Sequence, residues 1–270
     1  MKSKLPSLPY LIWMAVFIVV PVGLVLYFAF TTQDGAFTIE NISQVGQYTG
    51  VLLRSIWLAA VATVICLLIA YPLAFFLSRT RASVQRTFIM LVMLPMWMNF
   101  LLRTYAWMTL LENGGLINKF LGFFGLGPVQ MINTSGAVVL GMVYNYLPFM
   151  ILPIYSVIVK LDYSLLEAAR DLGANNVTVF RKVILPLSLP GVLSGITMVF
   201  VPSVSTFAIS RMLGGGTELL LGDLIERQFL GGAYNPQLGA AISLVMMIIV
   251  VICMLVMNRF GEGEEQAVML

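Results

Sequence analysis

The chain has 270 residues, of which 60% are hydrophobic and only 10% are charged, with a formal net charge of +3 and no histidine. Soluble domains are about 45–50% apolar, so this composition indicates an integral membrane protein. The scattered basic residues argue against a nucleic-acid partner, and the lack of histidine excludes zincin motifs and histidine-based catalytic triads.

Long uncharged runs predict six transmembrane helices, each close to the length of about 20 residues that a bilayer requires. In chain order the runs cover residues 9–30, 53–78, 88–111, 136–159, 188–210 and 236–258. The first run exceeds the apolar core of a signal peptide and no A-x-A cleavage site follows it, so we expect it to be retained. The third is interrupted by Pro95 and Arg103, and Pro95 is expected to kink it.

The lysines and arginines are distributed unequally between the two sets of loops. One set carries Lys2, Lys4, Arg79, Arg81, Arg86, Lys160, Arg170, Arg181, Lys182 and Arg259, and the other carries Arg54, Lys119, Arg211 and Arg227. Because basic residues accumulate in cytoplasmic loops, we expect both termini and the loop 160–187 to be cytoplasmic. The segments 31–52, 112–135 and 211–235 are then expected to face outward.

The first half of the 160–187 loop carries the pattern of a short helix. Ser164 and Glu167 fit the capping box S-x-x-E, which predicts a helix that begins at residue 165, and Gly173 suits its C-terminal end. Apolar residues recur at helical spacing and form a ridge on one face. The ridge consists of Leu165, Ala168, Ala169 and Leu172. Its spacing fits a docking helix as well as a helix whose alanines pack on the bundle.

The second half of the loop predicts another short helix. Asn175 or Asn176 can cap its start. Pro186 disfavours helical geometry in the residue before it, so this helix is expected to end near Leu185, where the next span begins.

The stretch EAARDLG, followed by ILPL, resembles the signature cytoplasmic loop of the permeases of ATP-binding-cassette (ABC) importers. The motif matches at Glu167, Ala168, Ala169, Gly173, Ile184, Leu185 and Pro186. The resemblance implies an all-α bundle of six transmembrane helices with the type I importer permease fold, in one domain over residues 1–270. It also implies that a cytoplasmic coupling helix seats in a cleft of a separate cytosolic ATPase dimer. The coupling residues would be Glu167, Ala168, Ala169, Asp171, Gly173, Leu185 and Pro186.

ATP and Mg²⁺ are expected to bind the partner ATPase, and this chain is expected to bind no cofactor. The phosphate-binding pattern G-x-x-x-x-G-K-[ST] does not occur in the sequence, so the chain is not itself the ATPase. The pattern G-x-S-x-G is also absent, which leaves an enzymatic role without support.

Segments 94–118, 144–156 and 212–230 are similar to the first permease subunit of spermidine/putrescine importers. This resemblance implies polyamine import across a prokaryotic plasma membrane by alternating access. The partners would be the lipid bilayer, a second homologous permease and an extracytoplasmic polyamine-binding protein. A permease for another small solute remains an alternative. An ion-coupled secondary transporter is another, although it normally embeds several ionisable groups, whereas only Arg103 lies within a predicted span.

A polycationic cargo requires carboxylates, carbonyl oxygens and aromatic faces along its path. The outer halves of the predicted spans supply such groups. The candidates are Trp97, Tyr105, Trp107, Glu112, Tyr144, Asn145, Tyr146, Ser203, Ser205 and Thr206. Any single tryptophan or tyrosine among them fits the interfacial aromatic belt at least as well, so only the cluster argues for a path. The stretch 202–207 carries hydroxyl groups and no acid.

Arg103 would repel a polycation, so we favour a structural role in which its guanidinium extends toward the outer surface or pairs with Glu112. Gly191 and Gly195 form a G-x-x-x-G pattern that permits close helix packing. Acidic residues of the outer loops are expected to be solvated, and together they form a modestly acidic rim suited to attract cations or to hold a docking protein. They are Asp34, Glu40, Glu112, Glu218, Asp223 and Glu226.

Overall fold

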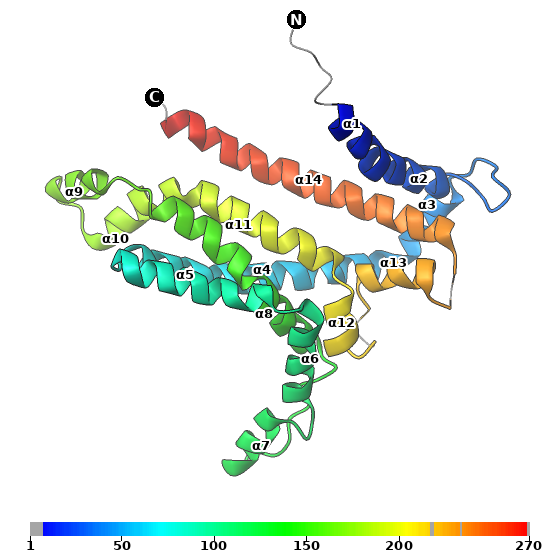
Figure 1. Cartoon of the computed structure of the whole chain (residues 1–270), viewed down its shortest axis with the longest axis horizontal. Coiled ribbons are helices and arrows are strands. Elements are labelled where there is room, and N and C mark those ends of the chain that lie inside the picture. Colours follow the sequence, from blue (N-terminus) through cyan, green and yellow to red (C-terminus); the bar gives the residue numbers. More distant parts are fainter. Residues whose placement is uncertain (1–7, 217–218, 233, 269–270) are drawn as a thin grey trace, which may run out of the picture.

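The computed structural model of the chain describes residues 8–216, 219–232 and 234–268. The helical elements, in chain order, are α1 Leu8–Met14, η2 Ala15–Val19, α2 Val20–Ala29, α3 Glu40–Val45, η3 Gly46–Tyr48, α4 Thr49–Ser78, α5 Ala82–Trp97, α6 Phe100–Leu111, α7 Leu116–Phe123, α8 Ser135–Ile158, α9 Tyr163–Asp171, α10 Asn176–Val179, η4 Phe180–Ile184, α11 Leu185–Ser205, α12 Ala208–Leu213, α13 Leu221–Leu230 and α14 Pro236–Val268. Figure 1 shows that the long helices form one bundle, with α9 and α10 at one end and α6 and α7 projecting away from it.

Five helical segments of the described chain are long and apolar enough to cross a bilayer by themselves. They are Pro9–Ala29, Glu40–Ser78, Ser135–Ile158, Asn176–Ser205 and Pro236–Met257. These segments overlap the first, second, fourth, fifth and sixth predicted spans. The fifth is displaced toward the N-terminus, because its helix already begins at Asn176 and ends at Ser205.

The third predicted span, 88–111, is wrong as a single kinked helix. Helices α5 and α6–α7 meet at 90°, and the break lies after Trp97 instead of at Pro95, which stays inside α5. Asn99 starts a new helix there, because its side-chain oxygen accepts the backbone N–H of Leu101 at 2.8 Å and caps α6. With 16 residues, α5 is about 24 Å long, which is short of the bilayer core of about 30 Å.

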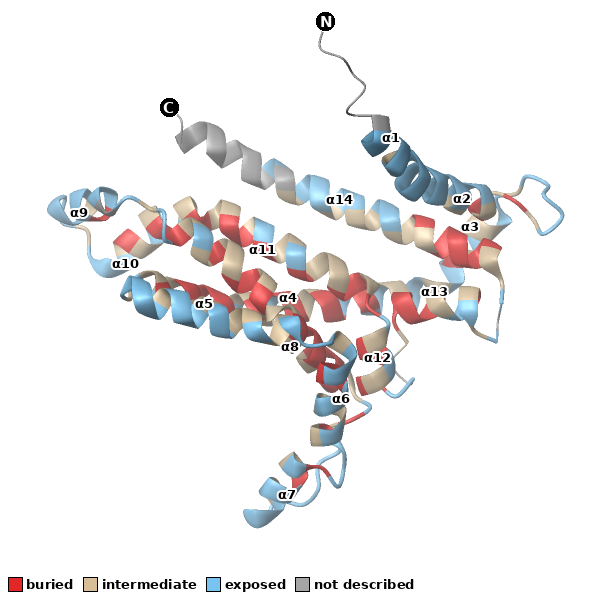
Figure 2. Cartoon of the chain, viewed as in Figure 1, coloured by how far each residue is buried: buried red, intermediate tan, exposed pale blue. Residues whose placement is uncertain are grey.

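Helices α4, α8 and α11 form the centre of the bundle, where buried side chains are concentrated (Figure 2). Helix α11 approaches α8 closely at its two glycines. A Cβ atom on Gly191 would lie 2.8 Å from the carbonyl oxygen of Pro153, and one on Gly195 would lie 2.7 Å from the sulfur of Met150. The close packing predicted from G-x-x-x-G is therefore confirmed.

Helices α1 and α2 lie at the edge of this centre, where α2 packs along α14. In Figure 2 their surfaces are almost entirely exposed. The exposed side chains are large and apolar, and they include Trp13, Phe17 and Tyr27. Such surfaces are stable against lipid tails, which agrees with a membrane-spanning first segment.

Candidate functional site

Helix α9 of the 160–187 loop begins earlier than the predicted capping box implies. It starts at Tyr163, and its N-cap is Asp162, whose carboxylate accepts the backbone N–H of Ser164 at 2.9 Å. The expected start at residue 165, with Ser164 as the cap, is therefore wrong. A carboxylate is a stronger acceptor than a hydroxyl and also interacts favourably with the helix dipole. The hydrogen bonds from Ser164 hold the pKa of Asp162 below its usual value.

Gly173 ends α9, as predicted. Its φ of 81° lies in the left-handed region, which a residue with a Cβ adopts only with strain. Its N–H donates to the carbonyl of Arg170 at 2.8 Å, and the next N–H, from Ala174, donates to Ala169 at 3.1 Å. These bonds satisfy carbonyl groups that the helix end would otherwise leave unpaired.

The two faces of α9 have different environments. Leu166 is 7% exposed and packs with Val179 and Ile184, and Ala169 is half-buried against the same cluster. The opposite face carries Glu167, Ala168, Asp171 and two ridge leucines, all of them exposed to solvent. The leucines Leu165 and Leu172 are 48% and 88% exposed. Of the predicted ridge, only Ala169 turns inward, so the alternative in which both alanines pack on the bundle does not hold.

The second helix of the loop starts where expected but does not end before the next span. Asn175 caps it, accepting the N–H of Thr178 at 2.8 Å, and the helix continues through α10, η4 and α11 without a break. The expected end near Leu185 is therefore wrong. The N–H of Leu185 donates to the carbonyl of Phe180, in the wider i to i+5 pattern of a π turn. This wider turn accommodates the ring of Pro186, which would obstruct a regular α-helical turn.

Aromatic contacts attach the loop to α4. The ring of Phe180 stands edge-on to Phe75 and to Tyr71, with centroid distances of 5.6 and 5.7 Å. The hydroxyl groups of Tyr71 and Ser188 share a hydrogen bond of 2.8 Å, which joins α4 to α11 immediately behind the π turn. Rigid rings and one buried hydrogen bond therefore connect this loop to two central helices.

The candidate path residues separate into two groups in the structure. In the first group, Trp107 of α6 stands edge-on to Tyr144 of α8, with ring centroids 5.4 Å apart. The hydroxyl of Tyr146 lies 3.5 Å from the carbonyl oxygen of Pro202 and also bonds to the side chain of Thr206. This group therefore connects α6, α8 and α11 in one region. Its remaining members are Asn145 and Ser203, both buried, and Ser205, which is half-buried.

The second group lies on the surface of the chain. Trp97 is 72% exposed, Tyr105 is 53% exposed and Glu112 is also exposed. These three residues do not join the first group, because their side chains are exposed on the surface of the chain. Their positions fit contact with lipid or with another subunit better than contact with cargo inside this chain.

Arg103 does not extend outward and does not pair with Glu112, so both predicted arrangements are wrong. Its side chain is 8% exposed, and its Nε and Nη1 atoms have no hydrogen-bond partner among the described residues. Its guanidinium lies within range of an electrostatic interaction with the hydroxyl of Tyr146. A buried cation without a paired anion is costly and therefore marks a functional region.

Two acidic residues of the outer helix α13, which are expected to be solvated, instead make contacts within the chain. Asp223 is 6% exposed, and its Oδ2 accepts the N–H of Leu220 at 3.0 Å. Burial raises the pKa of this carboxyl, against the opposing effect of a hydrogen bond from Ser210. Glu226 forms a 2.7 Å ion pair with Arg211. The predicted acidic rim is therefore wrong for these two acids, and Glu218 lies outside the described residues.

Known structures define the class of the protein. The chain superposes on a bacterial ABC transporter involved in the import of alginate with a TM-score of 0.80, at 16% sequence identity, over 95% of this chain and 93% of the other. It superposes on the MetNI methionine ABC transporter with a TM-score of 0.62, over 82% of this chain and 97% of the other. The fold is that of a type I ABC importer permease.

Sequence comparison then assigns the family. The chain belongs to the family of binding-protein-dependent transport system inner membrane components, which it matches over residues 66–263. It is 40% identical to the spermidine/putrescine transport system permease protein PotB of Haemophilus influenzae, over 93% of this chain and 91% of the relative. Identity to the PotB protein of Escherichia coli K12 is 37%, over 92% of this chain and 93% of the relative. The chain is thus a multi-pass membrane permease subunit, a translocation component without catalytic chemistry.

Proposed function

We propose that this permease moves polyamines such as spermidine and putrescine into the cytoplasm by alternating access, with energy from a partner ATPase. The observation that carries the proposal is the identity of 37–40% to spermidine/putrescine permeases over more than nine-tenths of the chain. An inside-negative potential of 100 mV favours the entry of each positive charge by about 2.3 kcal/mol. Coupling to an ATPase makes delivery unidirectional without a path that is open on both sides at once.

The exposed face of α9 is the surface that we assign to the ATPase. Glu167, Ala168 and Asp171 lie on it, whereas Leu166 anchors the opposite face. The small Ala168 side chain permits close approach of a cleft, and the acids can pair with basic groups of the ATPase. ATP and Mg²⁺ bind the ATPase, and the permease binds no cofactor. Leu185 and Pro186, at the start of α11, carry the motion into the bundle.

The assembled importer contains two copies of the ATPase, a second homologous permease and an extracytoplasmic polyamine-binding protein. One structural relative was crystallised in complex with a periplasmic protein that carries an alginate pentasaccharide, which supports an external delivery protein as a kind of partner. The excess of lysine and arginine in one set of loops supports a cytoplasmic position for both termini and for the 160–187 loop, in a prokaryotic plasma membrane. All of residues 1–270 act as one transmembrane domain.

The cargo path follows the first group of aromatic and hydroxyl residues. Trp107, Tyr144 and Tyr146 offer ring faces, each of which contributes about 0.5–2 kcal/mol to the binding of a cation. Hydroxyl and carbonyl oxygens of α11 lie beside them, as the contacts of Tyr146 with Pro202 and Thr206 show. The nearby charge of Arg103 disfavours prolonged residence of a polycation, which keeps the path a transit site.

Two measurements test this function. In the first, the importer is purified with its ATPase and reconstituted into lipid nanodiscs, and ATP hydrolysis is measured with the binding protein loaded with spermidine. We expect stimulation over the unloaded binding protein. Stimulation by a different solute, with none by spermidine or putrescine, would overturn the polyamine assignment and leave the ABC permease class intact.

The second measurement uses Glu167→Lys and Gly173→Pro. Lysine reverses a charge on the ATPase-facing surface, and proline cannot adopt the φ of 81° at residue 173. We expect both variants to insert into the membrane, to retain less ATPase on purification and to lose uptake. Glu40→Lys is the matched control, because it reverses an exposed charge at the opposite end of the bundle (Figure 1). Normal uptake in both loop variants would refute the coupling role.

A further inference from the structure

A cleft of about 400 Å³ lies between the end of α4 and the α9–η4 segment, beside the Phe75–Phe180 contact, and its polar side chains have no role in the transport mechanism above. The residues that line it are Phe75, Arg79, Arg170, Asn176, Val177, Phe180 and Ile184. One half is therefore apolar, formed by two rings and two aliphatic side chains. The other half carries two guanidinium groups and one amide.

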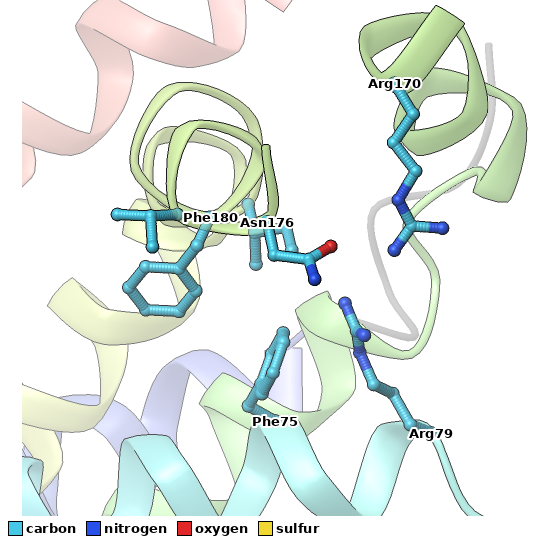
Figure 3. Close-up of a pocket in the computed structure, with 7 residues that line it drawn as sticks. Phe75, Arg79, Arg170, Asn176 and Phe180 are labelled. Atoms are coloured by element: carbon cyan, nitrogen blue, oxygen red, sulfur yellow. The ribbon is translucent and has the colours of Figure 1, made fainter. Parts of the chain in front are cut away.

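Figure 3 shows how the polar half is arranged. Arg79 extends from the end of α4 and Arg170 from the last turn of α9, and their guanidinium groups point toward one another across the cleft, with the Asn176 amide nearby. The guanidinium of Arg79 lies 4.2 Å from the ring centroid of Phe75, which helps to hold it in place. Within the described part of the chain, neither arginine forms an ion pair with a carboxylate.

Two guanidinium groups that face one another repel, even where water screens them. An anion bound between the two guanidinium groups is attracted to both of them, and this attraction offsets their mutual repulsion. Phosphate oxygens suit the site best, because a guanidinium presents parallel N–H groups that bind phosphate in a bidentate manner. The Asn176 amide can donate a further hydrogen bond. The polar half of the cleft is therefore complementary to a phosphate group.

The apolar half of the cleft favours a lipid over a free phosphate ion as the ligand. Phe75 lies in α4, and Phe180 lies in η4, which continues as α11. Both helices extend from the cleft into membrane-spanning segments. Among the lining residues, Val177 is 64% exposed. Farther along the same continuous helix, Leu185, which does not line the cleft, is 38% exposed, so apolar surface continues from the cleft toward the membrane-spanning part. A free ion would leave this wall in contact with water. An amphiphile with an anionic head covers both halves.

We propose that the cleft binds the phosphate headgroup of an anionic phospholipid, with the phosphate between Arg79 and Arg170 and the acyl chains along Val177 and Leu185. Basic pockets beside transmembrane helices on the cytoplasmic side are recognised sites for such headgroups. Arg79 belongs to the end of α4 and Arg170 to α9, so the lipid links the two elements at a second point beside the Phe75–Phe180 contact. Given the proposed coupling role of α9, anionic lipid stiffens the connection between the ATPase and the bundle.

The test uses the complete importer and measures lipid retention directly. The purified complex is equilibrated with equal amounts of phosphatidylglycerol and phosphatidylcholine, and bound lipids are counted by native mass spectrometry. We expect preferential retention of phosphatidylglycerol. Arg79→Gln combined with Arg170→Gln should weaken it about 30-fold, which corresponds to about 2 kcal/mol for two basic groups. Arg81→Gln combined with Arg181→Gln removes the same charge from exposed residues that do not line the cleft and should retain the lipid.

Four results would overturn the proposal. Equal retention of both lipids by the wild type, or equal loss in the cleft and control variants, would show that no specific headgroup site exists. Complete displacement of phosphatidylglycerol by millimolar inorganic phosphate would identify a site for the free anion instead. Unchanged lipid retention in the cleft variant, together with loss of the ATPase on purification, would assign the arginines to acidic residues of the ATPase.

This measurement requires neither cargo nor ATP, so its failure is distinguishable from a failure of the transport assignment. Thermal denaturation of each purified variant shows whether the complex is still folded. If the cleft variant does not assemble, the same lipid comparison with Arg170→Gln alone, which alters one exposed side chain of α9, decides the proposal.

Discussion

The ring of Phe180 stands edge-on to the ring of Phe75, with 5.6 Å between their centroids and 86° between their planes. Phe180 is the first residue of the π turn η4, and Phe75 lies in the last turn of α4. The contact joins the helix pair that we assign to the ATPase to a central span of the bundle. Edge-on aromatic pairs contribute about 0.5–1.5 kcal/mol beyond the area that they bury.

The first prediction concerns Phe75→Ala. Removal of this ring leaves Tyr71 as the remaining ring partner of Phe180 on α4 and takes away part of the packing around Ile184, so motion of α9 should displace α4 less. We expect ATP hydrolysis to persist while polyamine uptake falls several-fold. The measurement is the ratio of cargo transported to ATP hydrolysed in proteoliposomes.

Phe76→Ala is the matched control, because the neighbouring ring of Phe76 is 70% exposed on the same helix. It should leave the transport ratio near that of the wild type. If Phe75→Ala and Phe76→Ala transport equally well, the aromatic contact does not transmit motion.

The second prediction concerns the cargo path. Trp107 and Tyr144 present their rings to one another at 5.4 Å, so replacing both by alanine removes two cation-binding faces from one region. We expect the concentration of cargo that gives half-maximal uptake to rise about tenfold, the result of losing two contacts of modest strength. Uptake of radiolabelled spermidine and putrescine into proteoliposomes measures this change.

Trp97→Ala combined with Tyr105→Ala provides the control, since these rings are 72% and 53% exposed. The control removes one tryptophan and one tyrosine from the same region of the chain, outside the first group. Equal uptake by the two double variants would assign Trp107 and Tyr144 to the interfacial aromatic belt.

The third prediction concerns the contact between α8 and α11. A Cβ on Gly191 would lie 2.8 Å from the carbonyl oxygen of Pro153 and 2.9 Å from Cγ2 of Val157, so Gly191→Ala must separate two backbones. We expect a destabilisation of about 1–3 kcal/mol, which exceeds the helix propensity that alanine adds. Gly23→Ala, where no atom lies within 4 Å of the added Cβ, should be neutral or stabilising. Thermal denaturation of the purified subunit measures both, and equal midpoints would contradict the packing argument.

The spans could be predicted from the sequence because an uncharged run of sufficient length has few alternatives in a bilayer. The break in the third span was missed, although Asn99 follows Pro95 closely and is a good helix N-cap. Pro95 predicts a kink within one helix, whereas the cap at Asn99 starts a separate helix, α6. Similarly, Ser164 fitted the capping box, yet Asp162 is the stronger acceptor and starts α9.

The site was less predictable, because the environment of a side chain depends on the direction of its helix. Arg103 was expected to reach Glu112, which is the correct inference for a helix that continues straight through the membrane. The 90° turn before α6 buries the guanidinium near Tyr146 instead. The cleft between Arg79 and Arg170 also has no local signature, since residues far apart in the chain form it.

The last prediction concerns Asp223, which is buried where α13 begins. Burial raises the pKa of its carboxyl above 3.8, so the folded protein holds this proton more tightly than the unfolded chain does. Its contribution to stability is therefore greatest below the unfolded pKa, and it is lost as the pH rises to the folded pKa. Ser210, Leu220, Glu226 and Arg227 surround the carboxyl and set the net shift.

Asp223→Asn retains an acceptor for the Leu220 N–H and cannot ionise. The thermal midpoint of the variant minus that of the wild type should therefore increase as the pH rises above about 4, because only the wild type then acquires a buried charge. Titration of all other groups is common to both proteins and largely cancels in the difference. A difference that stays constant or decreases with pH would mean that the hydrogen bonds to Asp223 outweigh the effect of burial, and that its carboxylate is stabilised in the folded state.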